Sequence, residues 1–213
     1  MLSHRFLALA ILILASCKNA KKPKAAPQTV QNELENANLC DSVSKCLRSG
    51  DLVFRLGNDI TSYMLSQLNQ NDKSFSHCGI VSIENGSPFI YHAIGGEYNP
   101  DQKIKREAPK QWFSPKNNLM VAVSRLDLDS NKTRKLVETV QTYYKEGKKF
   151  DMEFDLNTDD RLYCAEMIYK SIQHAAADSN FIPTTAAFGK KYVGIDDLFR
   201  NVHASFICRV RYK

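Results

Sequence analysis

The sequence has no apolar run long enough to cross a bilayer as a helix. Its longest, over residues 6–14, falls well short of the roughly 20 residues that a transmembrane helix needs. Arg5 precedes this run, and the sequence Leu-Ala-Ser-Cys, ending at Cys17, follows it. This is the layout of a secretory signal peptide rather than of a membrane span. We therefore expect residues 1–16 to be a signal peptide.

The Leu-Ala-Ser-Cys sequence resembles the lipobox of bacterial lipoproteins, whose cysteine becomes the acylated first residue of the mature protein. The resemblance implies lipidation at Cys17 and a membrane partner held through that lipid. Lys18, in place of Asp, resembles outer-membrane sorting in Gram-negative bacteria, so we expect a protein anchored in the cell envelope, facing the periplasm or the surface. The alternative is a secreted protein with an incidental cysteine at this position.

The sequence also lacks the strong positive charge that nucleic-acid binding requires. The formal net charge is +6, but residues 1–30 hold five of the 29 basic residues and none of the 23 acidic ones. Residues 31–213 therefore carry a net charge of only about +1. No cluster of arginine and aromatic residues is present, so we expect no nucleic-acid partner.

The chain contains no internal repeat, and its 213 residues suit one folded domain after a leader. Residues 17–38 are mostly Lys, Ala, Pro, Gln and Asn, with almost no large apolar side chains. This composition predicts a flexible tether. The folded domain is then expected over residues 39–213.

Periodicity predicts more strands than helices, and the two types rarely alternate along the chain. An Asn-Gly turn between two apolar runs predicts a hairpin. This pattern indicates an α+β domain with a largely antiparallel sheet. The strands are expected at residues 52–54, 78–83, 89–94, 119–126 and 205–212, and the helices at 60–68, 105–113, 131–145, 164–174 and 195–200.

Cys164 opens one of these helices directly after a polar loop. The N–H groups and dipole at a helix start favour a thiolate and can hold an oxyanion. His77 lies on a predicted strand, and His92 lies across the hairpin, where it can fix the tautomer of a histidine. If the three converge, they form a nucleophilic site. Taken singly, Cys164 is equally well explained as a buried structural thiol, and a lone histidine such as His77 is more often structural than a base.

Three stretches, at residues 50–54, 76–81 and 163–168, together resemble the YiiX/YaeF-like enzymes. These are circularly permuted relatives of the NlpC papain-like amidohydrolases. In that family a Gly-Asp strand comes first, a Ser-His-x-Gly strand carries the base, and a Tyr-Cys-Ser-Glu-like helix start carries the nucleophile. The order is the same here, with Ala165 where Ser is common. The resemblance covers roughly residues 47–213 and implies a permuted, papain-like NlpC-type fold in which helices pack on an antiparallel sheet.

The resemblance implies that Cys164 is the nucleophile, His77 its base and His92 the orienting residue, as in the lecithin:retinol acyltransferase-like branch. Some relatives carry a carboxylate at the third position, for which Glu84 or Glu97 would be the nearest alternatives in sequence. Tyr163 is a candidate oxyanion donor, although it can equally pack. No cofactor and no metal is required.

The expected function is a cell-envelope cysteine hydrolase that cleaves an amide in a peptide, such as a cell-wall peptide, or in an acyl-amide. One alternative is a lipid-directed thioesterase, phospholipase or acyltransferase with the same site. Others are a non-catalytic envelope lipoprotein and a zinc-binding one. Close-spaced ligand pairs are absent, and Cys78 should face away from its neighbour His77 on a strand, which disfavours zinc.

Five cysteines remain besides the predicted lipidation site. Disulfides are permitted in an exported protein. Cys40 could pair with Cys46, and Cys78 could pair with Cys208 if the last strand lies beside the strand of Cys78. An odd number leaves one free thiol, for which Cys164 is the candidate.

Overall fold

The computed structural model describes residues 28–96, 99–187 and 189–213. The predicted signal peptide, the lipidation site Cys17 and the first part of the predicted tether lie outside these ranges. The elements follow the chain in the order α1 (Gln28–Lys45), β1 (Leu52–Gly57), α2 (Ile60–Ser66), β2 (His77–Glu84), β3 (Ser87–His92), β4 (Lys105–Glu107), α3 (Pro109–Trp112), β5 (Asn118–Leu126), α4 (Ser130–Lys145), α5 (Cys164–Ala176), β6 (Thr185–Ala187), β7 (Lys190–Tyr192), α6 (Ile195–Phe199) and β8 (Ala204–Arg211).

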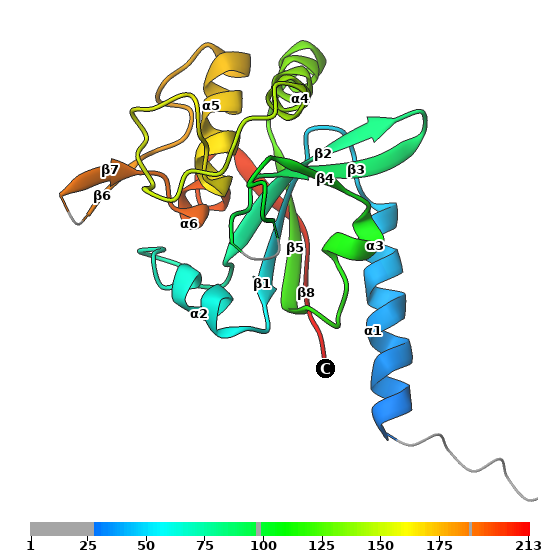
Figure 1. The fold of residues 1–213 in the computed structure, drawn as a ribbon. Coiled ribbons are helices and arrows are strands. Elements are labelled where there is room, and N and C mark those ends of the chain that lie inside the picture. Colours follow the sequence, from blue (N-terminus) through cyan, green and yellow to red (C-terminus); the bar gives the residue numbers. More distant parts are fainter. Residues whose placement is uncertain (1–27, 97–98, 188) are drawn as a thin grey trace, which may run out of the picture.

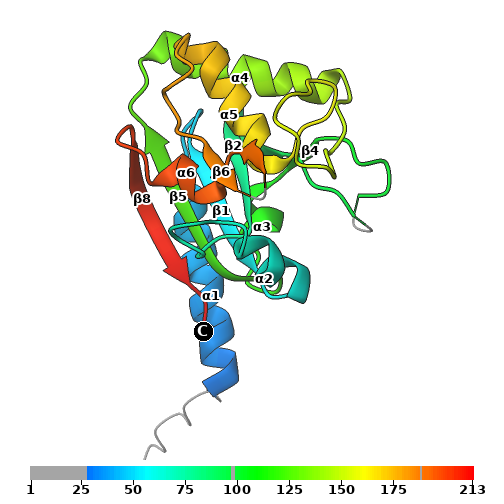
Figure 2. The same cartoon turned by 90° about the vertical axis from the view of Figure 1, so that its left-hand side faces the viewer.

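Six strands form one antiparallel sheet in the order β4-β3-β2-β1-β5-β8, and β6 pairs with β7 in a separate hairpin. Figure 2 shows β8 at one edge of the large sheet. Asn85 and Gly86 close the β2–β3 hairpin with φ values of 49° and 80°. Two successive positive φ values suit the tight turn that matches the strand twist, and Asn-Gly adopts them at low cost.

The sheet separates two apolar clusters because strand side chains alternate between its faces. Helices α4, α5 and α6 lie over one face, while α1 and α3 lie over the other (Figure 1). Leu52 and Phe54 of β1 point toward the first group, and Val53 points toward the second. Both faces of β1 are covered, so Leu52, Val53 and Phe54 are all fully buried. The strand therefore has consecutive apolar residues instead of alternating apolar and polar ones.

The antiparallel sheet packed with helices confirms the predicted α+β class. Most predicted strands and helices are present within a few residues of their expected bounds. The helix predicted over residues 105–113 is wrong in its first part. Lys105–Glu107 form the edge strand β4, paired with β3, and only Pro109–Trp112 are helical. The short β6–β7 hairpin was not predicted.

The predicted flexible tether is wrong for residues 28–38, which begin α1. This helix buries only Asn36, Cys40 and Val43, so its sequence has little of the apolar pattern by which helices are predicted. The Asn36 amide donates to the Lys213 carbonyl at 3.0 Å and accepts from the Lys213 N–H at 3.0 Å, which ties the helix to the end of the chain.

The cysteine pairs proposed from sequence are not the neighbours found in the fold. Strand β8 lies beside β5 rather than β2, which separates Cys208 from Cys78. The Sγ of Cys208 instead lies 4.0 Å from that of Cys46, and all five cysteines of the described residues are free thiols. Within the described residues, no helix combines the length and the apolar character needed to cross a bilayer.

Candidate active site

Cys164 is the first residue of α5, and local contacts fix that helix start. Tyr163 is the N-cap, and its main-chain N–H donates to the Glu166 carboxylate at 3.1 Å. A carboxylate in the first turn both satisfies an otherwise unpaired donor and complements the helix dipole. Glu166 is fully buried, and residue Cys164 is 9% exposed. Cys164 is therefore largely enclosed at the helix start.

The surroundings of the Cys164 sulfur favour its thiolate. A hydrogen bond from the Cys78 thiol makes the largest contribution to lowering the pKa of Cys164, while burial opposes this. The N–H groups of Cys78, Ala165 and Cys164 itself lower the pKa further. Burial in turn raises the pKa of Cys78 well above its ordinary value, so Cys78 stays protonated and acts as the donor.

His77 and His92 meet through their side chains, as the hairpin predicted. The Nε2 of His77 lies 2.9 Å from the Nδ1 of His92, and the rings meet edge to face. Gly79 makes this possible, because a Cβ at that position would lie 2.9 Å from the Tyr91 carbonyl oxygen and 3.3 Å from the Cβ of His92. Glycine in the Ser-His-x-Gly pattern is therefore needed for the close approach of the two strands.

A carboxylate that was not predicted completes the row. Glu107 lies on the edge strand β4, and its Oε2 is 3.4 Å from the Nε2 of His92. The contact with His92 lowers the pKa of Glu107, so the carboxylate is ionised at neutral pH. Burial lowers the pKa of His92, and it lowers the pKa of His77 well below its ordinary value. Both imidazoles are consequently neutral near pH 7.

These charges determine where the protons lie. An ionised Glu107 can only accept a hydrogen bond, so the neutral His92 carries its proton on Nε2. The Nδ1 of His92 must then accept from His77, which places the His77 proton on Nε2. The Nδ1 of His77 is left with a free lone pair and is the basic atom of the row. Glu107 thus sets the tautomer of His77 through the intervening His92.

Trp112 and Arg55 complete this side of the site. The fully buried Trp112 ring lies 5.2 Å from the His77 ring and 4.8 Å from the His92 ring, measured between centroids. The Arg55 guanidinium carbon lies 4.4 Å from the Trp112 centroid. Arg55 is also the cross-strand partner of His77 in the register of β1 and β2. Burial is the main reason that the pKa of His77 is lowered, and the positive charge of Arg55 is the second.

His77 and Cys164 are related through the start of β2. His77 and Cys78 project to opposite faces of the sheet: His77 packs on Trp112, while Cys78 belongs to the apolar cluster that includes α5. Cys164 meets this strand end through the Cys78 N–H, the peptide group directly after His77. Among the described residues, no hydrogen bond joins the Cys164 sulfur to the His77 ring, whose Nδ1 remains available.

The other candidates from sequence lie elsewhere. The Tyr163 hydroxyl accepts a hydrogen bond from the Val193 N–H at 2.8 Å, and its ring packs against Phe154. Glu84 binds Arg106 at 2.6 Å and accepts from the Tyr91 hydroxyl, so it is not the carboxylate beside the histidines. Glu97 lies outside the described residues.

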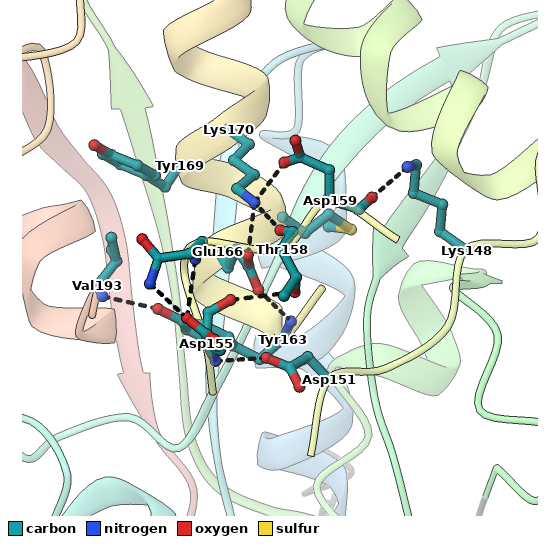
Figure 3. Close-up of polar contacts among 12 residues, drawn as sticks. Lys148, Asp151, Asp155, Thr158, Asp159, Tyr163, Glu166, Tyr169, Lys170 and Val193 are labelled. Carbon is teal, nitrogen blue, oxygen red and sulfur yellow. Dashed lines mark hydrogen bonds and ion pairs between the residues drawn. The ribbon is translucent and has the colours of Figure 1, made fainter. Parts of the chain in front are cut away.

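Two buried aspartates, Asp51 and Asp151, hold the backbone around the site. The buried Asp51 forms a two-bonded ion pair with Arg125, at 2.7 and 2.9 Å, and accepts from the Arg48 N–H. Asp151 accepts from the N–H of Glu153 and from that of Asp155, the second of which Figure 3 shows, and so shapes the loop ahead of α5. Both aspartates are structural in this arrangement.

Lys170 is the cation of a network that holds the start of α5 (Figure 3). Its Nζ lies 2.9 Å from Glu166 Oε1 and 2.7 Å from Asp159 Oδ1, and it also donates to the Thr158 carbonyl. Burial raises the pKa of Glu166 to about 7, although Lys170 opposes the rise. The helix start that presents Cys164 therefore depends on a buried carboxyl with a single nearby ammonium group.

We expect Lys170→Met to destabilise the fold by about 3 kcal/mol at pH 8.5 and by much less at pH 5.5. The folded-state pKa of Glu166, about 7, lies above its ordinary value of 4.5, so the folded state binds the proton more tightly. That stability is fully present below pH 4.5 and is lost as the pH rises through 7. Removing the Lys170 ammonium raises the pKa of Glu166 further, so the fold loses more stability at high pH.

Urea unfolding at the two pH values measures this effect. The exposed Lys145, in the last turn of α4, offers a control: Lys145→Met removes the same charge without touching a buried group. A loss in Lys170→Met that is equal at pH 5.5 and 8.5 would show that Glu166 does not depend on Lys170.

Comparisons with known proteins identify the family. The family described as permuted papain-like amidase enzymes, YaeF/YiiX, matches residues 46–197. The chain is 28% identical over 130 residues to the protein YiiX of Escherichia coli (strain K12), a match that covers 60% of this chain and 58% of that protein. The match thus spans less than two thirds of that relative's length.

A solved structure shows the same fold. The crystal structure of metalloprotein yiiX from Escherichia coli O157:H7 aligns with a TM-score of 0.63 and 21% sequence identity, and covers 77% of this chain and 98% of that one. The predicted permuted papain-like fold is confirmed. The chain belongs to the family of permuted papain-like amidases.

Proposed function

We propose that this protein is a cell-envelope cysteine hydrolase that cleaves an amide bond in a peptide, with Cys164 as nucleophile, His77 as base and His92 as orienting residue. The observation that carries the proposal is the row from Glu107 through His92 to His77, which leaves Nδ1 of His77 free on the residue directly before Cys78, whose thiol and N–H lower the pKa of Cys164. This arrangement supplies a base of defined tautomer and a thiol whose pKa is lowered.

In the first step His77 Nδ1 takes the proton of the Cys164 thiol, and the sulfur attacks the scissile carbonyl carbon. The tetrahedral intermediate then collapses: the C–N bond breaks, the leaving amine takes the proton from His77, and a thioester remains on Cys164. Water, deprotonated by the same Nδ1, hydrolyses the thioester and restores the thiol. Throughout, Glu107 and His92 hold the ring and stabilise the imidazolium that forms transiently.

Main-chain N–H groups at the start of α5 are better placed than Tyr163 to stabilise the oxyanion. The N–H groups of Cys164 and Ala165 already interact with the sulfur, so they lie close to the carbon that it attacks. The Tyr163 hydroxyl is engaged by the Val193 N–H. The contribution of Tyr163 to the oxyanion stays a prediction from sequence.

The substrate class is tested by product analysis. The full chain in detergent micelles is incubated with cell-wall fragments and, separately, with lipid extracts, and the products are identified by mass spectrometry. We expect new amine and carboxylate termini from the cell-wall peptides, and none in a parallel incubation with Cys164→Ala. Products only from the lipid extract would contradict peptide hydrolysis and favour the lipid-directed alternative.

One observation favours that alternative. Three side chains of α2 are strongly exposed, with fractions of 72% for Ile60, 59% for Tyr63 and 65% for Met64. Helix α2 packs on β1 and β2, the strands that carry Arg55 and His77. Exposed apolar side chains of this kind can contact an acyl chain or a lipid surface. A lipid-directed thioesterase, phospholipase or acyltransferase is therefore the second candidate.

A metal site finds no support in the donor set. The solved relative is described as a metalloprotein. In the described part of this chain, no three His, Cys, Asp or Glu residues are grouped so as to hold an ion. His77 and Cys78 project to opposite faces of the sheet, so these two neighbours cannot ligate one ion together. No step of the mechanism passes through a metal.

Lipid anchoring at Cys17 belongs to the same proposal. We expect Cys17→Ser to release the protein from the membrane fraction without changing its melting temperature, because residue 17 precedes the folded domain. The fractions are compared after a high-salt wash, since the nearby lysines alone can hold a chain on anionic lipid. Retention of the washed Cys17→Ser protein on membranes would contradict a lipid anchor at this cysteine.

A further inference from the structure

Arg55 is a cation beside the site that the fold does not neutralise. The side chain is partly buried, and burial lowers its pKa. Its guanidinium forms neither a hydrogen bond nor an ion pair with any residue that the structure describes, and its one close partner is the face of the Trp112 ring, 4.4 Å away. A guanidinium has five N–H donors in a planar fork, which suit a carboxylate.

The position of Arg55 relates it to the reacting groups. It is the cross-strand partner of His77, and it shares Trp112 with both histidines. Its charge also interacts with that of the Cys164 thiolate. A ligand group bound to Arg55 would therefore lie beside the cross-strand neighbour His77 and within range of the charge on Cys164.

The other arginines near charged groups differ from Arg55. Arg125 is held by Asp51 at 2.7 Å, and Arg106 is held by Glu84 at 2.6 Å. Glu107 attracts Arg55 only at longer range, because its carboxylate is directed to His92. A structural arginine would be expected to have such a carboxylate partner, and Arg55 has none within ion-pair distance among the described residues.

We propose that Arg55 is a specificity-determining residue that binds a substrate carboxylate located next to the scissile amide, so that the enzyme acts on acidic peptides. This inference rests on the proposed function and names its substrate class. The carboxylate is either the C-terminal group of the peptide or an acidic side chain. Arg55 pairs with it through two N–H groups and offsets its repulsion from the thiolate.

Thiol-directed probes test this without knowledge of the substrate. Chloroacetylglycine carries a terminal carboxylate, the chloroacetyl derivative of glutamic acid α-amide carries a side-chain carboxylate, and that of glutamine amide is neutral. In each, the thiolate attacks the CH2 carbon, a C–S bond forms and chloride leaves with the bonding electrons. Alkylation of Cys164 in the full chain is followed by peptide mass spectrometry, which separates it from the other cysteines.

We expect at least one anionic probe to react with wild-type Cys164 faster than the neutral probe, and the ratio of the two rates to fall about tenfold in Arg55→Gln. Arg55→Lys should keep an intermediate ratio, because a point charge replaces the fork. Arg134→Gln is the matched control, since it removes an exposed guanidinium on α4. If the rate ratio falls for chloroacetylglycine, the bound carboxylate is a C-terminal group; if it falls for the glutamic acid derivative, it is an acidic side chain.

Two results would overturn the inference. Equal slowing of all three probes in Arg55→Gln would mean that Arg55 acts on the thiol, and an unchanged ratio would mean that it has no part in anion binding. In both cases Cys164 is still reactive, and the proposed hydrolase function stands. If no probe modifies wild-type Cys164, the proposed function itself fails, and the inference fails with it.

Discussion

Cys164→Ala and His77→Ala are each expected to lower turnover by about 10⁴-fold or more. The first removes the attacking sulfur, and the second removes the only ring nitrogen that the row of histidines leaves free to accept its proton. The double variant should be little worse than either single one, because residues that act as one unit are not additive. The two single variants and the double variant are compared by their initial rates on the peptide substrate identified by product analysis.

Alanine at residue 164 is a small change at a helix start, so the melting temperature should fall little. Losses that multiply in the double variant would mean that His77 and Cys164 act independently. Substantial activity in Cys164→Ala would remove this cysteine from the mechanism.

His92→Ala should lower kcat by about 100- to 1,000-fold and leave Cys164 reactive. The variant keeps the nucleophile and the base but loses the group that fixes the tautomer of His77. His92→Gln should recover part of the loss, because its amide can accept from His77 Nε2. Alkylation of Cys164 by iodoacetamide at several pH values reports the remaining thiolate.

The effect of replacing His92 by glutamate depends on the neighbouring Glu107. Some relatives have a carboxylate at the orienting position, but His92→Glu alone would put two carboxylates side by side at the former 3.4 Å contact and raise the pKa of one of them. We expect His92→Glu combined with Glu107→Gln to be more active than His92→Glu. If His92→Ala behaves like wild type, the assignment of the third residue is wrong.

The sequence predicted those parts of the site that have a local signal. The Asn-Gly turn and two apolar runs placed His77 and His92 on adjoining strands, and their side chains meet at 2.9 Å. The polar loop before an amphipathic helix placed Cys164 at a helix start. Each of these inferences needs only neighbouring residues and the twofold or 3.6-fold period of the backbone.

The missed residues have only long-range signals. Glu107 lies on a three-residue edge strand of charged side chains, which has no apolar alternation to mark it. Arg55 and Trp112 are brought together only by the packing of α3 beneath the sheet. Helix α1 was missed because it buries three side chains in 18 residues. Such contacts depend on which strands become neighbours, and the local pattern does not determine that order.

The clasp between Asn36 and Lys213 also decides how the domain would respond to a mechanical pull from its N-terminal side. Force entering through α1, a rod about 27 Å long over its 18 residues, passes into the last residue and so into β8. Strand β8 is one edge of the sheet, and β3, which carries His92, lies next to the opposite edge. Through these bonds, part of the tension on a tethered chain would be borne by the edge of the sheet opposite to the histidines.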